Sequence, residues 1–315
     1  MKKERILTKA WVVAIGAIIS CALWGSAFPC IKIGYRLLNI ASDDVSTQIL
    51  FAGVRFTLAG VLSIVFESIL ERRILLPKKS SVKNILKLCM MQTVIQYLFF
   101  YIGLAHASGV TGSIITGTNS LLAILISCFV FRQERMTLPT LVGCVVGLAG
   151  VVVANLGGGS IGTQMHINGE GFVFIAALFY AISSIYLQRY SQKDDPVMLS
   201  GYQFLVGGVI LSVIGFAMGG RLSGFMVQSS LLLLYLGFLS AMAYALWGIL
   251  LKYNPVSRVA IYGFTNPVIG VLLSAILLGE GGQAFSAKNL LALLLVCAGI
   301  IVVNLWKKKA ENPAA

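Results

Sequence analysis

The octet AGVVVANL (residues 149–156) recurs near the other end of the chain as AGIIVVNL (residues 298–305), with five of the eight positions identical. Three further matches lie at almost the same separation, so that the four offsets range only from 146 to 149 residues. Collinear matches at so constant a separation indicate that the chain contains two copies of one unit. The further matches are VRFTLAG with YQFLVGG, TNSLLAILIS with TNPVIGVLLS, and Glu134 with Glu280.

The residues that follow the two octets differ in charge. The first octet continues as the uncharged GGGSIGTQ, whereas the second continues as WKKK. Of the 315 residues of the chain, 58% are hydrophobic and 11% are charged, and the mean hydropathy is +0.90. Soluble domains carry roughly 25% charged residues. A lipid bilayer is therefore the expected solvent of this protein.

Ten apolar stretches approach the length of about 20 residues that a helix needs to cross a bilayer. The connections between them are mostly short, and none has room for a separate soluble domain. The expected fold is therefore an all-α integral membrane protein with ten transmembrane helices. The predicted spans cover about residues 11–35, 47–68, 85–105, 109–131, 138–156, 170–189, 198–218, 229–251, 258–279 and 288–306.

The Lys and Arg residues lie mainly between alternate spans. When the N-terminus is placed in the cytoplasm, nineteen of them fall on the cytoplasmic side and three on the opposite side. This bias follows the positive-inside rule and predicts a multi-pass protein of the cell membrane with both termini in the cytoplasm. The net charge of +13 then reflects membrane topology, and nucleic acid is not implied as a partner.

Each copy of the repeated unit contains five predicted spans, within residues 11–156 and 170–306. Because five is an odd number, the second copy enters the membrane from the opposite side. Inverted repeats of this kind occur in many secondary transporters, whose solute site lies near the bilayer midplane between the two repeats. The duplication therefore predicts a carrier that works by alternating access. A channel and a lipid scramblase are the alternatives that would keep the same fold.

Longer stretches of the chain carry a family resemblance, among them CALWGSAFPCIKIG, YIGLAHASGVTGSIITGTNSLLAILISCFVFRQER and NPVSRVAIYGFTNPVIGVLLSAILLGE. In these stretches the chain resembles EamA-type members of the drug/metabolite transporter superfamily. The resemblance implies a secondary transporter that exports small metabolites such as amino acids or related solutes. The family commonly has Pro in the fourth helix where this chain has Ser120, whereas the ninth helix keeps Pro267.

Polar groups inside membrane helices are costly, so they are candidates for function, although they also join helices to one another. Arg55 lies deep in the second span, where it could face a wet cavity or extend to the outer headgroups. Gln92 and Gln96 are four residues apart, a spacing that puts both amides on one face of a regular helix. Asn119 and Asn266 occupy equivalent positions in the two units, each after a Thr.

Several aromatic side chains lie deeper than the interfacial belts in which such residues usually anchor a membrane protein. They could form the wall of a cavity or pack helices together. Pro267 removes a backbone donor from the ninth span and predicts a hinge or gate there, or a packing kink. The residues predicted to line a solute pathway are Trp24, Ser26, Arg55, Gln92, Gln96, Asn119, Tyr180, Ser183, Tyr202, Gln203, Tyr244, Trp247, Tyr262 and Asn266.

The eleven acidic residues all lie in predicted loops or at the ends of spans. A membrane carboxylate for protons or lipophilic cations is therefore not expected, and neutral, zwitterionic or anionic solutes are favoured. His106 and His166 lie in predicted outer loops, and no motif for a phosphate, cofactor or metal is present, so an enzyme is disfavoured. Gly143 and Gly147 predict close helix contacts, either within the chain or in a homodimer.

Overall fold

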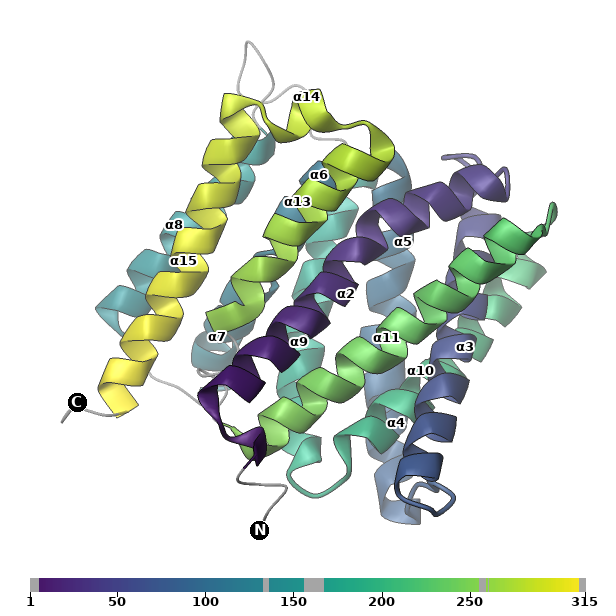
Figure 1. Cartoon of the computed structure of the whole chain (residues 1–315), viewed down its shortest axis with the longest axis horizontal. Helices are drawn as coiled ribbons and strands as arrows, with labels where there is room; N and C mark the ends of the chain where they lie inside the picture. The colour runs from purple at the N-terminus through teal and green to yellow at the C-terminus, as the bar shows by residue number, and fades with distance from the viewer. Residues whose placement is uncertain (1–5, 133–135, 156–166, 255–258, 260, 312–315) are drawn as a thin grey trace.

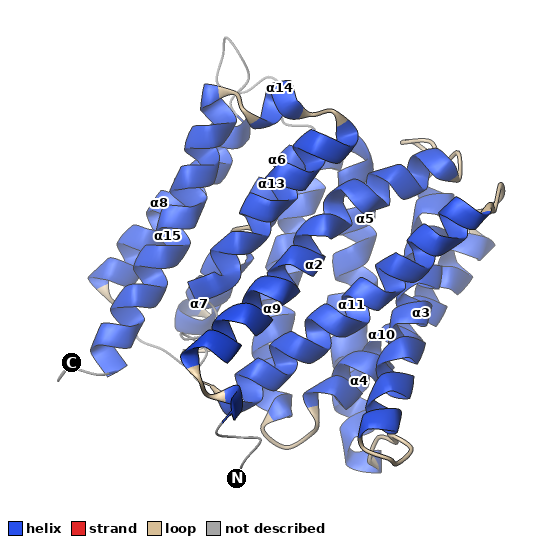
Figure 2. Cartoon of the chain, viewed as in Figure 1, coloured by secondary structure: helices blue, strands red, loops and turns tan. Residues whose placement is uncertain are grey.

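The structure is a computed structural model that describes residues 6–132, 136–155, 167–254, 259 and 261–311. Over these residues the chain consists of helices joined by turns and loops, without a strand (Figure 2). The all-helical character of the predicted fold is thereby confirmed. Glu134 and His166 lie outside the described residues.

The long helices of the first half are predominantly apolar, as is typical of segments whose backbone groups must be satisfied internally in lipid. Asp44 precedes the second helix and accepts a hydrogen bond from the Thr47 N–H at 3.0 Å, which caps that helix. The elements are α2 (Ala10–Leu37), α3 (Val45–Leu70), η1 (Lys79–Ser81), α4 (Val82–Leu88), η2 (Cys89–Ile95), α5 (Gln96–His106), α6 (Gly109–Thr116), α7 (Asn119–Phe129) and α8 (Leu138–Asn155).

The second half has a similar succession of helices. Asp195 caps one of them by accepting hydrogen bonds from the N–H groups of Val197 and Met198 at 2.8 and 3.0 Å. The elements are η3 (Ile167–Gly171), α9 (Phe172–Ser191), α10 (Pro196–Ala217), α11 (Val227–Tyr253), η4 (Ile261–Phe264), α13 (Thr265–Leu278), α14 (Gly281–Ala284) and α15 (Ala287–Glu311).

Seven of the helical segments in the described residues are long and apolar enough to cross a membrane. Three shorter apolar helices, Leu138–Ala154, Tyr262–Leu278 and Ala287–Val302, lie at the fifth, ninth and tenth predicted spans. The chain is therefore a multi-pass helical membrane protein. The count of ten spans stays a prediction, because these three segments fall short of the length that marks a span on its own.

The helices form one bundle of tilted, roughly antiparallel segments (Figure 1). The helix α2 packs against both α11 and α13, and α8 and α15 pair along one edge of the bundle. The start of α2 and the end of α15 lie on the same side of the molecule (Figure 1).

Glycines set the close contact between α3 and α10. A Cβ atom added to Gly60 would overlap the backbone of Leu205, and one added to Gly208 would overlap the backbone of Thr57. Gly60 and Gly208 are equivalent positions of the two sequence units. Each glycine therefore lets the opposite helix approach its backbone in the same way.

The helices α8 and α15 also meet through glycine. A Cβ atom on Gly299 would overlap the backbone of Gly147 and the carbonyl oxygen of Gly143, and one on Gly150 would overlap the Ala292 carbonyl oxygen. The Gly143 and Gly147 face predicted to mediate close helix contacts is thus covered by α15 of the same chain. The homodimer stays a prediction, and it would need another face.

One carboxylate joins two helices at the end of the bundle near α14. Glu280 follows α13, and its two carboxylate oxygens accept hydrogen bonds from the N–H groups of Gly109 and Val110 at 3.2 and 3.0 Å. These N–H groups are the free donors at the start of α6. Glu280 therefore ties the end of α13 to the beginning of α6.

Candidate functional site

The fourth and ninth predicted spans are interrupted at equivalent positions. In the first half, α6 ends at Thr116 and α7 begins at Asn119, while in the second half η4 gives way to α13 at Thr265. The Thr118 hydroxyl donates to the Ile115 carbonyl oxygen at 2.7 Å. The equivalent Thr265 hydroxyl donates to the Tyr262 carbonyl oxygen, also at 2.7 Å. Both positions therefore have the same side-chain hydrogen bond to the carbonyl oxygen three residues earlier.

Pro267 and Gly117 bring the two breaks together. Gly117 lies against the Pro267 ring, where an added Cβ atom would come within 3.1 Å of the proline Cγ. The Pro267 carbonyl oxygen accepts a hydrogen bond of 3.1 Å from the Ser113 hydroxyl. The first half has no proline at this point. The Gly117 N–H is shared between the Ser113 and Ile114 carbonyl oxygens, and the Thr118 N–H donates to the Ile115 carbonyl oxygen three residues earlier.

A cavity of about 80 Å³ lies next to these breaks, among helices of both halves. This volume is several times the roughly 10–15 Å³ that one water molecule needs, so the cavity can hold several waters or part of a small solute. None of the lining residues carries a carboxylate. The lining residues are Trp24, Ala27, Phe28, Arg55, Gln96, Tyr97, Phe100, Thr116, Asn119, Ala176, Ala177, Tyr180, Tyr244 and Asn266.

The structure brings half of the predicted pathway residues together around this cavity. They come from seven helices, and they include the equivalent asparagines that directly follow the two helix breaks. The side-chain oxygens of Asn119 and Asn266 are buried and have no hydrogen-bond partner among the described residues. The predicted residues that line the cavity are Trp24, Arg55, Gln96, Asn119, Tyr180, Tyr244 and Asn266.

Arg55 is held in place by three hydrogen bonds from its guanidinium group. Its Nε donates to the Leu236 carbonyl oxygen at 3.2 Å, and its Nη2 donates to the Ser240 hydroxyl at 2.9 Å. Its Nη1 donates to the Tyr101 hydroxyl. The residue is only 3% exposed, so it lies inside the bundle and does not extend to the headgroups. Arg55 is among the residues that line the cavity, and its part in a solute pathway stays a prediction.

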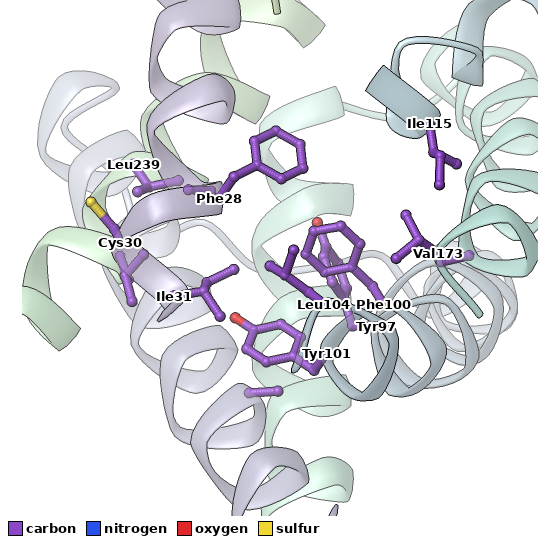
Figure 3. Close-up of a cluster of buried hydrophobic side chains, with 14 of the residues drawn as sticks. Phe28, Cys30, Ile31, Tyr97, Phe100, Tyr101, Leu104, Ile115, Val173 and Leu239 are labelled. Carbon is purple, nitrogen blue, oxygen red and sulfur yellow. The ribbon is translucent and has the colours of Figure 1, made fainter. Parts of the chain in front are cut away.

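Aromatic rings stabilise the charge of Arg55 and form much of the wall. The Arg55 guanidinium carbon lies 5.0 Å from the centroid of the Phe56 ring and 5.8 Å from that of Tyr101. Figure 3 shows the rings of Tyr97, Phe100 and Tyr101 gathered beside Phe28 in this part of the core. The core therefore presents aromatic surface to the inner side of the cavity.

A second aromatic group lies where α2 meets α11. The Trp24 ring lies edge-on to Tyr244, with ring centroids 5.3 Å apart, and tilted to Trp247 at 5.2 Å. The Tyr244 hydroxyl is 3.3 Å from that of Tyr97 and can exchange a hydrogen bond with it. Trp24 and Tyr244 face the cavity, whereas Trp247 supports the Trp24 ring from behind.

The two glutamines of the third span are separated by an irregular turn. The π-helix η2 covers Cys89–Ile95, and α5 begins at Gln96. Gln92 lies within the π-helix and Gln96 begins α5, and their side chains have different surroundings. Gln96 lines the cavity, whereas the Gln92 side-chain oxygen accepts a hydrogen bond of 2.7 Å from Gln203 of α10. Gln92 and Gln203 therefore join two helices.

The other predicted pathway residues make contacts away from the cavity lining. The Ser26 hydroxyl is 2.7 Å from the Tyr235 hydroxyl, and the Ser183 hydroxyl donates to the Tyr180 carbonyl oxygen in its own helix. The Tyr202 hydroxyl donates to the Leu75 carbonyl oxygen at 2.8 Å. Trp247 and Tyr262 pack on a small apolar cluster formed by Val13, Ala17, Leu250 and Val259.

Sequence reasoning did not select seven of the lining residues. Most are apolar or aromatic side chains, which do not stand out in a chain where such residues are the majority. Phe100 follows Gln96 by one helical turn, and this spacing is the one signal that pointed to the cavity side. The unselected residues are Ala27, Phe28, Tyr97, Phe100, Thr116, Ala176 and Ala177.

The described residues contain no group of three or more His, Cys, Asp or Glu that could hold a metal ion. The apolar helices and the cavity among them define the class to which the chain belongs, a multi-pass membrane protein with a small cavity between its helices. The site offers a cation, amides, hydroxyls and aromatic faces. These groups can bind a small polar molecule.

A family model described as the EamA-like transporter family matches residues 11–156 and 167–305. The chain therefore belongs to the EamA-like transporter family, as its resemblance implied. The uncharacterized transporter YvbV of Bacillus subtilis (strain 168) is 25% identical over 319 residues, which cover 93% of this chain and 91% of that protein.

Other similar proteins agree in name and in fold. The uncharacterized inner membrane transporter YedA of Escherichia coli (strain K12) is 27% identical over 301 residues, covering 90% of this chain and 88% of that protein. A solved crystal structure with 21% sequence identity covers 96% of this chain and 98% of its own, with a TM-score of 0.65. At that identity the match bears on the fold alone.

Proposed function

We propose that the protein is a ten-helix carrier that moves a small polar metabolite across the cell membrane by alternating access. The observation that carries this proposal is the cavity. Equivalent residues of the two sequence units, Asn119 and Asn266, follow matching helix breaks and line the same cavity together with Arg55. Interrupted helices at a midplane site are typical of secondary transporters.

Two inverted halves, residues 11–156 and 170–306, are the proposed moving parts. The helices α3 and α10 are equivalents in the two units and pack on each other, and so do α8 and α15. In both pairs, each helix has a glycine that lies against the backbone of the other helix. A two-fold axis in the membrane plane between inverted halves would produce this pattern.

The outer gate of the proposed carrier is the contact between α6 and α13, which belong to opposite halves. Gly109 lies against Ser274, where an added Cβ atom would be 3.2 Å from the serine Cβ. Glu280 and Ser113 add hydrogen bonds between the same two elements. Opening the cavity outward would require these contacts to separate, and Pro267 would serve as the hinge.

The proposed cargo is an amino acid or a related small solute, and the proposed direction is export. The absence of a carboxylate from the cavity lining supports neutral, zwitterionic or anionic solutes over lipophilic cations. The protein would act without a cofactor or metal, with both termini in the cytoplasm. A channel or a lipid scramblase would share the fold, and an enzyme is the less favoured alternative.

Counterflow in liposomes that contain the purified protein tests the proposal. Liposomes loaded with an unlabelled amino acid should accumulate the labelled amino acid transiently, with a rate that saturates, because a carrier exchanges solutes one for one. The panel should include the twenty common amino acids and simple sugars as comparison solutes. Flux that never saturates would identify a channel, and a chemically altered solute would identify an enzyme.

A further inference from the structure

Arg55 is the one cation among the residues that line the cavity. In the part of the chain that the structure describes, no carboxylate forms an ion pair with it. Ion pairs in that part of the chain join other residues, such as Arg73 with Glu71 and Lys252 with Asp195. A charge that is buried and unpaired costs free energy, which only a bound partner can offset in full. The guanidinium therefore provides a site for an anionic group.

The hydrogen bonds of Arg55 leave part of its binding capacity free. A guanidinium has five N–H donors, one on Nε and two on each terminal nitrogen. The contacts with Leu236, Tyr101 and Ser240 occupy one donor on each of the three nitrogens. One N–H on each of the two terminal nitrogens is left without an acceptor among the described residues. Two oxygens of one planar group are the natural acceptors for such a pair.

We infer that the transported solute carries a single carboxylate, which binds to these two N–H groups of Arg55. The inference rests on the proposed function, because it assigns the cargo of the same cavity. The single positive charge of Arg55 balances one negative charge. A doubly charged phosphate would bring a second negative charge, for which the lining has no cation. The alanines and aromatic rings of the wall would hold the apolar part of the solute. The side-chain oxygens of Asn119 and Asn266, which have no partner among the described residues, would accept hydrogen bonds from the ammonium group of an amino acid.

The equivalent residue of the second unit does not offer a second site for an anion. Gln203 aligns with Arg55 in the two units, and it is uncharged, fully buried and bonded to Gln92. The structure therefore provides one position for an acidic group in the cavity. A binding stoichiometry of one carboxylate for each chain follows from this asymmetry.

Matched acid and amide pairs test the inference on the purified full-length protein. The probes are alanine with alaninamide, leucine with leucinamide, lactate with lactamide, and propionate with propionamide. The affinity of each is measured by calorimetry, with sodium chloride as a competitor. Because hydrogen bonds to a charged group are the stronger ones, at least one acid should bind about tenfold more tightly than its amide.

Three variants separate recognition from folding. Arg55→Gln should reduce the acid-to-amide affinity ratio to less than about twofold, whereas Arg36→Gln, at an exposed position near the end of α2, should leave the ratio unchanged. Ser240→Ala removes one support of Arg55 and keeps both free N–H groups, so it should retain the preference for the acid. The acid-to-amide affinity ratio does not depend on the amount of folded protein, so a variant that folds poorly can still be compared with the wild type.

Equal binding of acid and amide by the wild type, or an unchanged ratio in Arg55→Gln, would overturn the inference. Competition by chloride as strong as that by the acids would overturn it as well. If neutral solutes are exchanged in counterflow and no acid binds, the solute does not carry the inferred carboxylate, but the proposed carrier function is retained. If no solute is exchanged at all, the proposed function itself fails.

Discussion

Arg55 and the two glutamines of the third span show how much individual residues of a membrane helix can differ in role. All three are polar and deeply buried. Arg55 and Gln96 line the cavity, whereas Gln92 is used up in a hydrogen bond with Gln203. The same residue type, four positions apart, is therefore expected to affect transport in one case and stability in the other.

Gln96→Ala and Gln92→Ala form a matched pair of variants. Gln96→Ala should lower the counterflow rate severalfold with little change in melting temperature, because Gln96 contacts the cavity. Gln92→Ala should lower the free energy of unfolding by about 1–3 kcal/mol, because it leaves Gln203 buried without its partner. Proteoliposome assays and thermal melting in detergent measure the two effects. The opposite pattern would show that the two glutamines have been assigned to the wrong roles.

Half of the residues that line the cavity were predicted from their residue type and their place in a span. Arg55, Asn119 and Asn266 stand out because polar groups are rare in an apolar span. Gln92 was grouped with Gln96 because of their spacing, and the spacing does not show that Gln203 of α10 binds the Gln92 side chain. Phe28 and Tyr97 were missed because aromatic side chains are too common in this chain to mark a site.

At the scale of helices, the two breaks show that a proline is not required. The first half has Ser120 where the second half has Pro267, yet in both halves a new helical element begins just before this position, α7 at Asn119 and α13 at Thr265. The absence of Pro at residue 120 therefore does not remove the break. At this point the first half has Gly117 and the Thr118 hydroxyl, which donates to the Ile115 carbonyl oxygen.

Ser120→Pro should consequently be tolerated. Residue 120 lies in the first turn of α7, where a backbone N–H has no helical acceptor and proline is accepted. Transport should stay within about twofold of the wild-type rate, as measured by counterflow. Leu125→Pro, in the middle of the same helix, is the matched control and should abolish folding, because it removes an internal hydrogen bond at a cost of about 3 kcal/mol or more. A loss of transport in Ser120→Pro would show that α7 does not begin where the structure has it.

The glycine contacts between helices lead to a second prediction at this scale. Gly208→Ala should destabilise the protein by about 1–3 kcal/mol, because the added Cβ overlaps the backbone of Thr57 and forces α3 and α10 apart. Gly281→Ala is the control, since no atom lies within 4 Å of a Cβ added there. Melting temperatures of the two variants in detergent provide the comparison. Equal melting temperatures would contradict the packing of α3 on α10.

At the scale of the whole molecule, the sequence predicted a multi-pass helical membrane protein, and the structure has the all-helical character expected of one. The two inverted halves stay a prediction. Four collinear matches and the distribution of Lys and Arg predicted two inverted units with a shared interior, before any contact was known. The distribution of charged residues and the repeat extend over the whole chain, so both can be recognised from the sequence alone. The cavity lining depends on side-chain directions in eight helices, which local irregularities such as η2 change.

Reporter fusions at Gly158 and Lys193 test the inverted topology. Gly158 should report the outer side and Lys193 the cytoplasmic side, because one span separates them in the predicted arrangement. Alkaline phosphatase is active outside the cytoplasm and green fluorescent protein inside it, so the two reporters give complementary signals. Localisation of both positions to the same side would rule out two inverted halves.

The most direct test of alternating access is a reversible lock on the proposed outer gate. A Cβ atom at Gly109 would lie 3.2 Å from the Ser274 Cβ, close to the spacing of about 3.5–4.5 Å in disulfides. The variant Gly109→Cys with Ser274→Cys, made with the six native cysteines replaced by Ala, is assayed by counterflow. We predict that transport stops on oxidation and returns on reduction, while each single variant is unaffected. Unchanged transport through a fully formed disulfide would contradict the separation of α6 from α13, and with it the proposed mechanism.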